Sequence, residues 1–292
     1  MQVLRTSPAR LALFLFLAGV AFAVAGVVVG MLGAPRMQAA PLAGAVFAIG
    51  LFADTAVCAL LAGERLSDLG FRASRRDILA VPVAFAAGAL LFSGVTLVLG
   101  HAAGGEWQLG TSAPMRTALL GLVPVLCLFL SEELLFRGYG FQQLRRIGGP
   151  GGAVVVSALA FGGYHLLGSG DWAMGAVFRM AMPTVAGLVF GYAVVRTGSL
   201  AVPIGLHWGG NWAQYALLGL GHPAGQTVAV WNMPLSEDQI RMLVAPDLLP
   251  HLPYLAALGL AFLLVQATPQ GLGLATGCSG RSATQPTAGP ER

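Results

Sequence analysis

The chain has 292 residues, of which 56% are hydrophobic and 10% charged, and its mean hydropathy is +0.76. A soluble globular domain carries about 25% charged residues, so this composition excludes that class and indicates an all-α polytopic membrane protein. All 16 basic residues are arginine, and their placement at particular loops favours orientation in a bilayer over a nucleic-acid partner. The three cysteines lie far apart and predict neither a disulfide framework nor a Cys-based metal site.

Runs of about 20 mainly apolar residues predict transmembrane helices within a single helical domain over residues 1–267. The eight predicted spans are residues 11–33, 41–62, 78–100, 116–144, 151–168, 173–195, 199–220 and 248–267. The first run resembles a signal peptide that would be cleaved within residues 1–25, but its uninterrupted apolar length favours a retained helix. The composition of residues 268–292 is typical of a disordered tail, because it is rich in Gly, Thr, Ser, Pro and Gln.

The arginines outside the predicted spans indicate how the chain lies in the lipid bilayer. With the N-terminus in the cytoplasm, eleven arginines fall on the cytoplasmic side of the membrane. Only Arg36, Arg116 and Arg241 fall on the opposite side. This distribution satisfies the positive-inside rule and predicts that both termini are cytoplasmic. The expected location is an integral membrane position, which in a bacterium is the inner or plasma membrane.

The fourth predicted span contains two adjacent glutamates and an arginine. Ionisable groups at bilayer depth are costly and by default mark a functional site. Glu133 and Arg137 are four residues apart, so they share a helix face and can pair. Glu132 is rotated by about 100 degrees from Glu133 and is left without a partner in sequence. An unpaired carboxylate in a low-dielectric site is suited to act as a general acid or base near neutral pH. The alternative is a solvated charge pair, which would explain Glu133 and Arg137 but not Glu132.

A histidine in the fifth predicted span is expected at a similar depth. His165 lies about 21 Å from the cytoplasmic end of its span, and Glu132 lies about 20 Å from Arg145, at 1.5 Å per residue. Gly162 and Gly163 precede the histidine and allow another helix to approach closely. Taken alone, His165 is more typical of a packed or hydrogen-bonded histidine. A catalytic role is favoured only because His165 is expected at the same membrane depth as Glu132 and because the other polar clusters are present.

The seventh predicted span carries a second histidine with an asparagine four residues later. His207 and Asn211 share a face, and Gly209 and Gly210 between them are expected to leave an open groove. His207 lies only about 12 Å from the predicted helix start, so helix tilt is needed to bring it level with His165. The alternative is a pair that joins helices through hydrogen bonds.

Other polar and aromatic residues in the apolar runs have structural interpretations. Asp54 and Arg179 lie inside predicted spans, and structural pairing is the default for both. Trp208, Trp212 and Tyr215 follow helical spacing, which favours packing or an interface belt over a ligand site.

The three clusters together resemble a known family. Glu-Glu-x-x-x-Arg at 132–137, Phe-x-x-x-His at 161–165 and His-x-x-x-Asn at 207–211 occur in the order found in the CAAX-protease and bacteriocin-processing (CPBP, Abi) family of intramembrane endopeptidases, CAAX prenyl protease type II-like. The resemblance covers about residues 116–220. It implies one cavity lined by Glu132, His165, His207 and Asn211, with Glu133 and Arg137 as a supporting pair. It also implies an enzyme that hydrolyses a peptide bond of a membrane-associated protein or peptide.

Two mechanisms fit these residues. In the first, Glu132 and His165 activate a water that attacks a peptide carbonyl, and His207 and Asn211 stabilise the oxyanion without a cofactor. In the second, Glu132, His165 and His207 hold a Zn²⁺ ion with an open position for water. The first is slightly favoured, because the ligands come from separate helices and no His-Glu-x-x-His motif is present.

Two other classes of function stay open at this point. A transporter or ion relay would use Glu132, Arg137, His165 and Asp54 as a path for protons, but the sequence lacks the inverted repeats that favour such a fold. A non-catalytic immunity or scaffold protein would keep the fold without turnover. The sequence does not identify the substrate.

Overall fold

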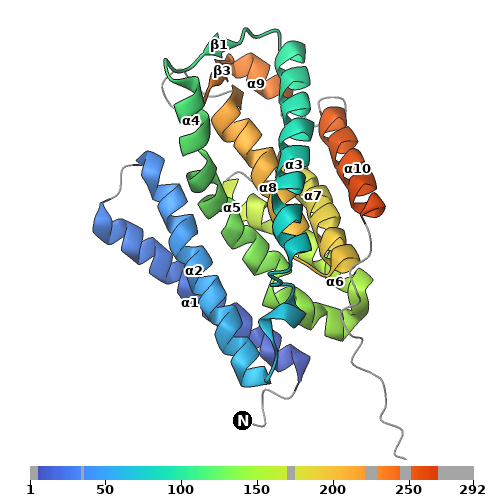
Figure 1. The fold of residues 1–292 in the computed structure, drawn as a ribbon. Helices are drawn as coiled ribbons and strands as arrows, with labels where there is room; N and C mark the ends of the chain where they lie inside the picture. The colour runs from blue at the N-terminus through green and yellow to red at the C-terminus, as the bar shows by residue number, and fades with distance from the viewer. Residues whose placement is uncertain (1–5, 34–35, 170–174, 221–228, 244–250, 269–292) are drawn as a thin grey trace, which may run out of the picture.

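The computed structural model describes residues 6–33, 36–169, 175–220, 229–243 and 251–268, and these are mainly helical (Figure 1). The predicted tail, apart from Thr268, lies outside the described residues. The helices are α1 (Ser7–Leu32), α2 (Arg36–Ala62), α3 (Arg75–Ala102), α4 (Pro114–Leu120), α5 (Leu122–Arg137), α6 (Tyr139–Ser169), α7 (Gly175–Thr197), α8 (Ala201–Trp212), α9 (Glu237–Leu243) and α10 (Leu252–Ala267). A short 3-10 turn, η2 (Leu66–Leu69), and a π-helical turn, η3 (Ala213–Leu217), complete the helical elements.

Five helical stretches within the described residues are long and apolar enough to cross a membrane. They are Ser7–Leu32, Ala39–Ala62, Arg75–Ala102, Pro114–Leu166 and Met180–Thr197. These stretches confirm a helical membrane protein. The seventh and eighth predicted spans contain the shorter helices α8, with 12 residues, and α10, with 16 residues. The count of eight spans therefore stays a prediction.

The fourth predicted span is not one straight helix. α5 ends at Arg137, Gly138 has a non-helical backbone (φ −76°, ψ −134°), and the chain turns sharply into α6 (Figure 1). A second break lies at Gly149, whose φ of 73° favours a residue without a Cβ. The depth estimate for Glu132, which assumed a helix continuing to Arg145, is therefore wrong: α5 ends about 8 Å beyond Glu132.

A small sheet replaces the end of the seventh predicted span. Residues 218–220 were expected to be helical but form β2 (Leu218–Leu220), which pairs in parallel with β3 (Trp231–Met233). β3 also pairs antiparallel with β1 (Gln108–Leu109), giving the strand order β1-β3-β2. Gly219 at the centre of β2 is a poor helix former, which accounts for the end of the helix there.

Glycines in α8 bring that helix against α3. A Cβ on Gly205 would lie 2.6 Å from the carbonyl oxygen of Val81, and a Cβ on Gly209 would overlap the carbonyl of Phe85. Gly210 faces the ring of Phe92 in the same way. The open groove expected at Gly209 and Gly210 is therefore absent from this described region, because α3 fills it.

Gly162 has the role predicted for it, and Gly163 does not. A Cβ on Gly162 would lie 2.6 Å from the carbonyl oxygen of Met180, so this glycine permits the close contact between α6 and α7. A Cβ on Gly163 would meet open space. The close approach of helices therefore depends on only one of the two residues.

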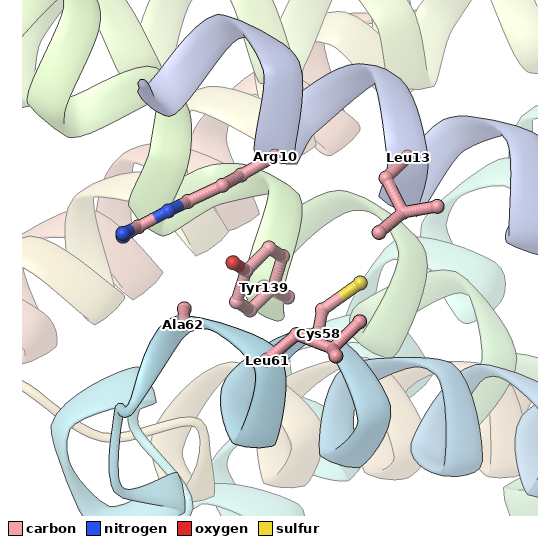
Figure 2. A pocket seen from close by; sticks show the side chains of 6 residues that line it. All are labelled: Arg10, Leu13, Cys58, Leu61, Ala62 and Tyr139. Atoms are coloured by element: carbon pink, nitrogen blue, oxygen red, sulfur yellow. The ribbon is translucent and has the colours of Figure 1, made fainter. Parts of the chain in front are cut away.

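The α1–α2 hairpin is tied to α6 at one end by ion pairs. Glu64, just after α2, lies 2.6 Å from Arg10 of α1 and 2.5 Å from Arg146 of α6. Figure 2 shows the small pocket beside this link, where Arg10, Leu13, Cys58, Leu61 and Ala62 surround the buried ring of Tyr139. The link holds α1 in place against α6.

The two ionisable residues given a structural interpretation have different outcomes. Asp54 is buried in α2 and accepts a hydrogen bond from Cys58 Sγ at 3.3 Å. The side chain of Arg179 lies outside the described residues. The default of structural pairing therefore has support for Asp54 alone.

Candidate active site

Three helices bring most of the predicted site residues together inside the bundle. Glu132 and Glu133 come from α5, His165 from α6 and His207 from α8. Glu132 is 8% exposed, Glu133 1% and His207 7%. The ring of Phe161 links the helices, because its centroid lies 4.6 Å from that of His165 and 5.9 Å from that of His207. Residues more than seventy positions apart thus share one buried polar site.

His207 lies between the two glutamates. Its Nδ1 is 2.7 Å from Oε1 of Glu133, and its Nε2 is 3.7 Å from Oε2 of Glu132. Since an ionised carboxylate only accepts hydrogen bonds, Nδ1 of the ring is the donor to Glu133. Glu133 thereby fixes the orientation of the imidazole and directs Nε2 toward Glu132.

Arg137 balances the charge of Glu133. The arginine is fully buried, and its Nη1 lies 3.3 Å from Oε1 of Glu133. Its guanidinium carbon also lies 4.3 Å from the ring centroid of Phe161 and 5.4 Å from that of Phe190. A buried charge is tolerated when it has both a counter-charge and favourable ring contacts. The pair expected from the four-residue spacing is therefore present.

His165 is held by its own helix. Its Nδ1 lies 2.9 Å from the carbonyl oxygen of Phe161, and a carbonyl only accepts, so Nδ1 carries the proton. Nε2 is then the basic nitrogen of the neutral ring. His165 is half-buried and interacts electrostatically with Glu132. The histidine thus presents a basic atom near the carboxylate.

Glu132 and His165 open onto the same cleft. This cleft has a volume of about 660 Å³, and its walls come from α1, α2, α5 and α6. Apart from Glu132, His165 and Tyr164, its lining is apolar: Leu15, Ala18, Gly19, Phe22, Phe47 and Leu135. Oε2 of Glu132 is buried and has no hydrogen-bond partner within the described residues. The carboxyl group of Glu132 and the imidazole of His165 therefore both line the space that a bound molecule would occupy.

Asn211 does not join this group in the structure. Its Nδ2 donates a hydrogen bond of 3.1 Å to the backbone oxygen of His207, one turn earlier in α8. The shared face predicted for His207 and Asn211 exists, but the amide group is used within the helix. A role for Asn211 in the chemistry therefore stays a prediction.

Two tyrosines near Glu132 were not identified as site residues from the sequence. Tyr164 lines the cleft beside His165, and Tyr215 packs on Phe129 with a centroid distance of 5.8 Å. Both phenols interact electrostatically with Glu132. Tyr215 continues the His207 and Asn211 face by four residues, and that spacing was the available signal. Aromatic residues at helical spacing usually form core, so the spacing by itself favours packing for Tyr215.

The described residues do not form an evident metal site. No group of three or more His, Cys, Asp or Glu side chains in the described ranges is arranged to hold a metal ion. Nδ1 of His207 is hydrogen-bonded to Glu133, and Nδ1 of His165 is hydrogen-bonded to a backbone carbonyl. Each ring therefore has only Nε2 available as a metal ligand. The donors of Glu132, His165 and His207 do not converge on one point, as tetrahedral zinc requires.

Comparison with known proteins gives one match. The family model for type II CAAX prenyl endopeptidase Rce1-like proteins matches residues 114–213. This stretch starts at the first residue of α4 and ends one residue after α8, so it contains the glutamates, the arginine and the histidines of the site but not the α1 and α2 walls of the cleft. No curated protein and no solved structure matches the chain. Over residues 114–213, the chain is therefore similar to the type II CAAX prenyl endopeptidases, in agreement with the resemblance carried by its three motifs.

Proposed function

We propose that the protein is an intramembrane endopeptidase that hydrolyses a peptide bond of a membrane-associated protein or peptide with an activated water. The observation that carries this proposal is the cleft in which Glu132 and His165 are exposed to one space. A general base must lie within hydrogen-bond reach of the water that it activates. The carboxyl group of Glu132, which lines this cleft beside His165, is suited to that role.

The reaction begins when Glu132 takes a proton from water. His165 Nε2 accepts a hydrogen bond from the same water and orients it toward the substrate. The water oxygen bonds to the carbonyl carbon, and the carbonyl oxygen becomes an oxyanion. Glu132 then gives its proton to the amide nitrogen as the carbon–nitrogen bond breaks. The base is thereby restored and water is divided between the two products.

His207 is the donor we assign to the oxyanion. In its protonated form the ring donates from Nδ1 to Glu133 and directs Nε2 at Oε2 of Glu132. His207 does not line the cleft, so this role requires the substrate carbonyl oxygen to enter between His207 and Glu132. A donor aimed at developing charge stabilises the transition state more than the ground state. Asn211 is proposed as the second donor, and this role requires its amide to leave the carbonyl of His207.

Glu133 and Arg137 are positioning residues in this scheme. Glu133 holds the imidazole of His207, and Arg137 neutralises Glu133 in a dry environment. Neither side chain lines the cleft. The buried pair therefore orients the oxyanion donor and does not touch the substrate.

The catalytic type is proposed to be glutamate, with water activation by protein groups. The poor convergence of Glu132, His165 and His207 as ligands supports this choice over zinc. If zinc were held by these three residues, it would act as a Lewis acid on the same water. Metal content measured beside activity distinguishes the two types.

The proposed topology keeps eight spans in a single domain with both termini in the cytoplasm. Arg10, Glu64 and Arg146 meet at one end of the helices, which supports placing those arginines on one side of the bilayer. The positive-inside rule makes this side cytoplasmic. The location proposed is the plasma membrane, or the inner membrane in a bacterium.

The test is cleavage in proteoliposomes by wild-type protein and by Glu132→Gln. General-base catalysis contributes typically 10²–10⁴-fold, so the variant is expected to lose at least a hundredfold in rate. The substrates are membrane-tethered peptides with fluorescent ends. Glu106→Gln, at an exposed glutamate remote from the cleft, is the matched control. Undiminished cleavage by Glu132→Gln would rule out the proposed mechanism.

Absence of cleavage by any form would favour the transporter or the scaffold. The two are separated by measuring proton flux in the same vesicles. A relay through Asp54 predicts that Asp54→Asn reduces flux, whereas the protease predicts no effect of Asp54→Asn on cleavage. Asp54 is buried in α2 and bonded to Cys58, so its neutral variant retains the packing of the helix.

A further inference from the structure

A second cavity lies beside α4 and the first half of α5. Its volume is about 700 Å³, and it contains neither Glu132 nor either site histidine. Its lining is apolar along α5, at Pro124, Val125 and Leu128. The lining is polar just before the start of α4, at Thr111 and Ser112. The cavity is therefore amphipathic, with a polar mouth and an apolar body.

Arg116 lies at the polar mouth. The arginine is exposed and lines the cavity, and it forms no ion pair with any residue in the described ranges. A guanidinium group binds phosphate oxygens through two parallel hydrogen bonds. An anionic group at the mouth would thus meet an available positive charge.

The body of the cavity ends where α2 crosses α5. Gly44 of α2 touches α5 so closely that a Cβ there would lie 2.7 Å from the carbonyl oxygen of Cys127. Pro41, on the near side of this crossing, lines the second cavity, whereas Phe47, on the far side, lines the catalytic cleft. The crossing therefore lies between the two spaces along α2.

The lining of the cavity along α4 and α5 has about the depth of one bilayer leaflet. α4 ends at Leu120 and α5 begins at Leu122, so the 12 residues from Arg116 to Leu128 span at most about 18 Å at the helical rise. The hydrocarbon core is about 30 Å thick, so one leaflet contributes about 15 Å. An acyl chain of one leaflet would run from the mouth to the crossing.

We propose that this cavity binds an anionic phospholipid, with its phosphate on Arg116 and one acyl chain along α5 as far as Leu128. A cation at the mouth and an apolar body along α5 together fit a lipid. A peptide substrate would instead have to continue past Gly44 to reach Glu132. This proposal is independent of the hydrolytic activity.

The experiment is native mass spectrometry of the full-length protein in detergent with phosphatidylglycerol or phosphatidylcholine of identical acyl chains. Wild-type protein is expected to retain phosphatidylglycerol at lower concentration than phosphatidylcholine. Arg116→Gln is expected to lose about fivefold in phosphatidylglycerol affinity, the equivalent of about 1 kcal/mol per basic residue near a lipid headgroup. Arg75→Gln, at an exposed arginine that starts α3, should bind like wild type.

A second variant tests the body of the cavity. Leu120, at the end of α4, lines the cavity and is 62% exposed, so Leu120→Trp fills the space without disturbing the interior. This variant is expected to weaken both lipids. Free glycerol phosphate should not displace the bound lipid, because it lacks the acyl chain.

The proposal is overturned by either of two results. One is that wild-type protein retains phosphatidylglycerol and phosphatidylcholine equally, as Arg116→Gln does. The other is unchanged lipid retention by Arg116→Gln together with altered peptide cleavage in phosphatidylcholine vesicles, which would make the cavity part of the substrate path. Thermal unfolding of each variant checks that the fold is intact.

Discussion

His207 and Glu133 form the shortest hydrogen bond of the candidate site, with 2.7 Å between Nδ1 and Oε1. The bond joins α8 to α5 across 74 positions of sequence. It leaves the second nitrogen of the ring directed at Glu132. The side chain that sequence spacing paired only with Arg137 therefore also sets the geometry of the proposed oxyanion donor.

Removal of His207 is expected to reduce the rate of hydrolysis without abolishing it. His207→Ala removes one oxyanion donor, and loss of such a donor typically costs 10²–10³ in kcat. The measurement is kcat in proteoliposomes, with His101→Ala, at an exposed position near the end of α3, as control. A fall smaller than threefold would remove His207 from the oxyanion site.

Breaking the buried ion pair is expected to affect stability first. Glu133→Leu leaves Arg137 buried without its counter-charge, which costs about 3–5 kcal/mol. The double variant Glu133→Leu/Arg137→Met removes both charges and should regain most of that stability. Unfolding in a denaturing detergent measures both effects.

Measuring the rate of cleavage distinguishes a structural role of Glu133 and Arg137 from a role in positioning His207. The double variant should fold but stay slow, because His207 has lost the acceptor that orients it. Full activity of a stable double variant would mean that Glu133 contributes to folding alone.

Narrowing the cleft is expected to reduce substrate binding and leave the fold intact. Gly19 of α1 lines the cleft, and a Cβ at this position meets nothing within 4 Å. Gly19→Leu should therefore raise KM severalfold for a bulky substrate while the helix gains stability from the loss of glycine. Gly26→Leu, on the same helix with equal space but away from the cleft, is the matched control. Equal KM values for the two variants would mean that substrate does not occupy this cleft.

Chelation is expected to leave the rate unchanged. The glutamate type predicts that a strong chelator alters kcat by less than twofold, and that purified protein contains substoichiometric zinc. Stoichiometric zinc, with activity lost to the chelator and restored by the metal, would assign Glu132, His165 and His207 as ligands.

The convergence of the site was predictable from the sequence only in part. Helical spacing correctly pairs Glu133 with Arg137, because residues four apart share a face whatever surrounds the helix. The same rule does not say which neighbouring helix that face meets. The contact of Glu133 with His207 depends on how α8 packs on α5, and the sequence carries no local signal for it.

The glycines of α8 likewise do not indicate from the sequence which helix packs against them. Gly209 and Gly210 suggested open space beside the histidine, yet α3 occupies it through Phe85 and Phe92. A glycine in a membrane helix permits either a groove or a close contact, and the partner helix decides. The helix break at Gly138 has no clear signal in the sequence either, because an isolated glycine inside a helical pattern is usually tolerated.

Glu64 fixes one end of α1, and no ion pair in the described residues fixes the end at Leu32. Toward that end α1 is held mainly by apolar contacts, with buried Ala25 and the edge of the Phe22 ring packed on Phe47. Apolar contacts exchange readily with lipid chains, whereas the arginines around Glu64 attract water. We therefore expect the two reactants to arrive from different directions: the peptide sideways out of the lipid past α1, and the water from the aqueous side of the membrane.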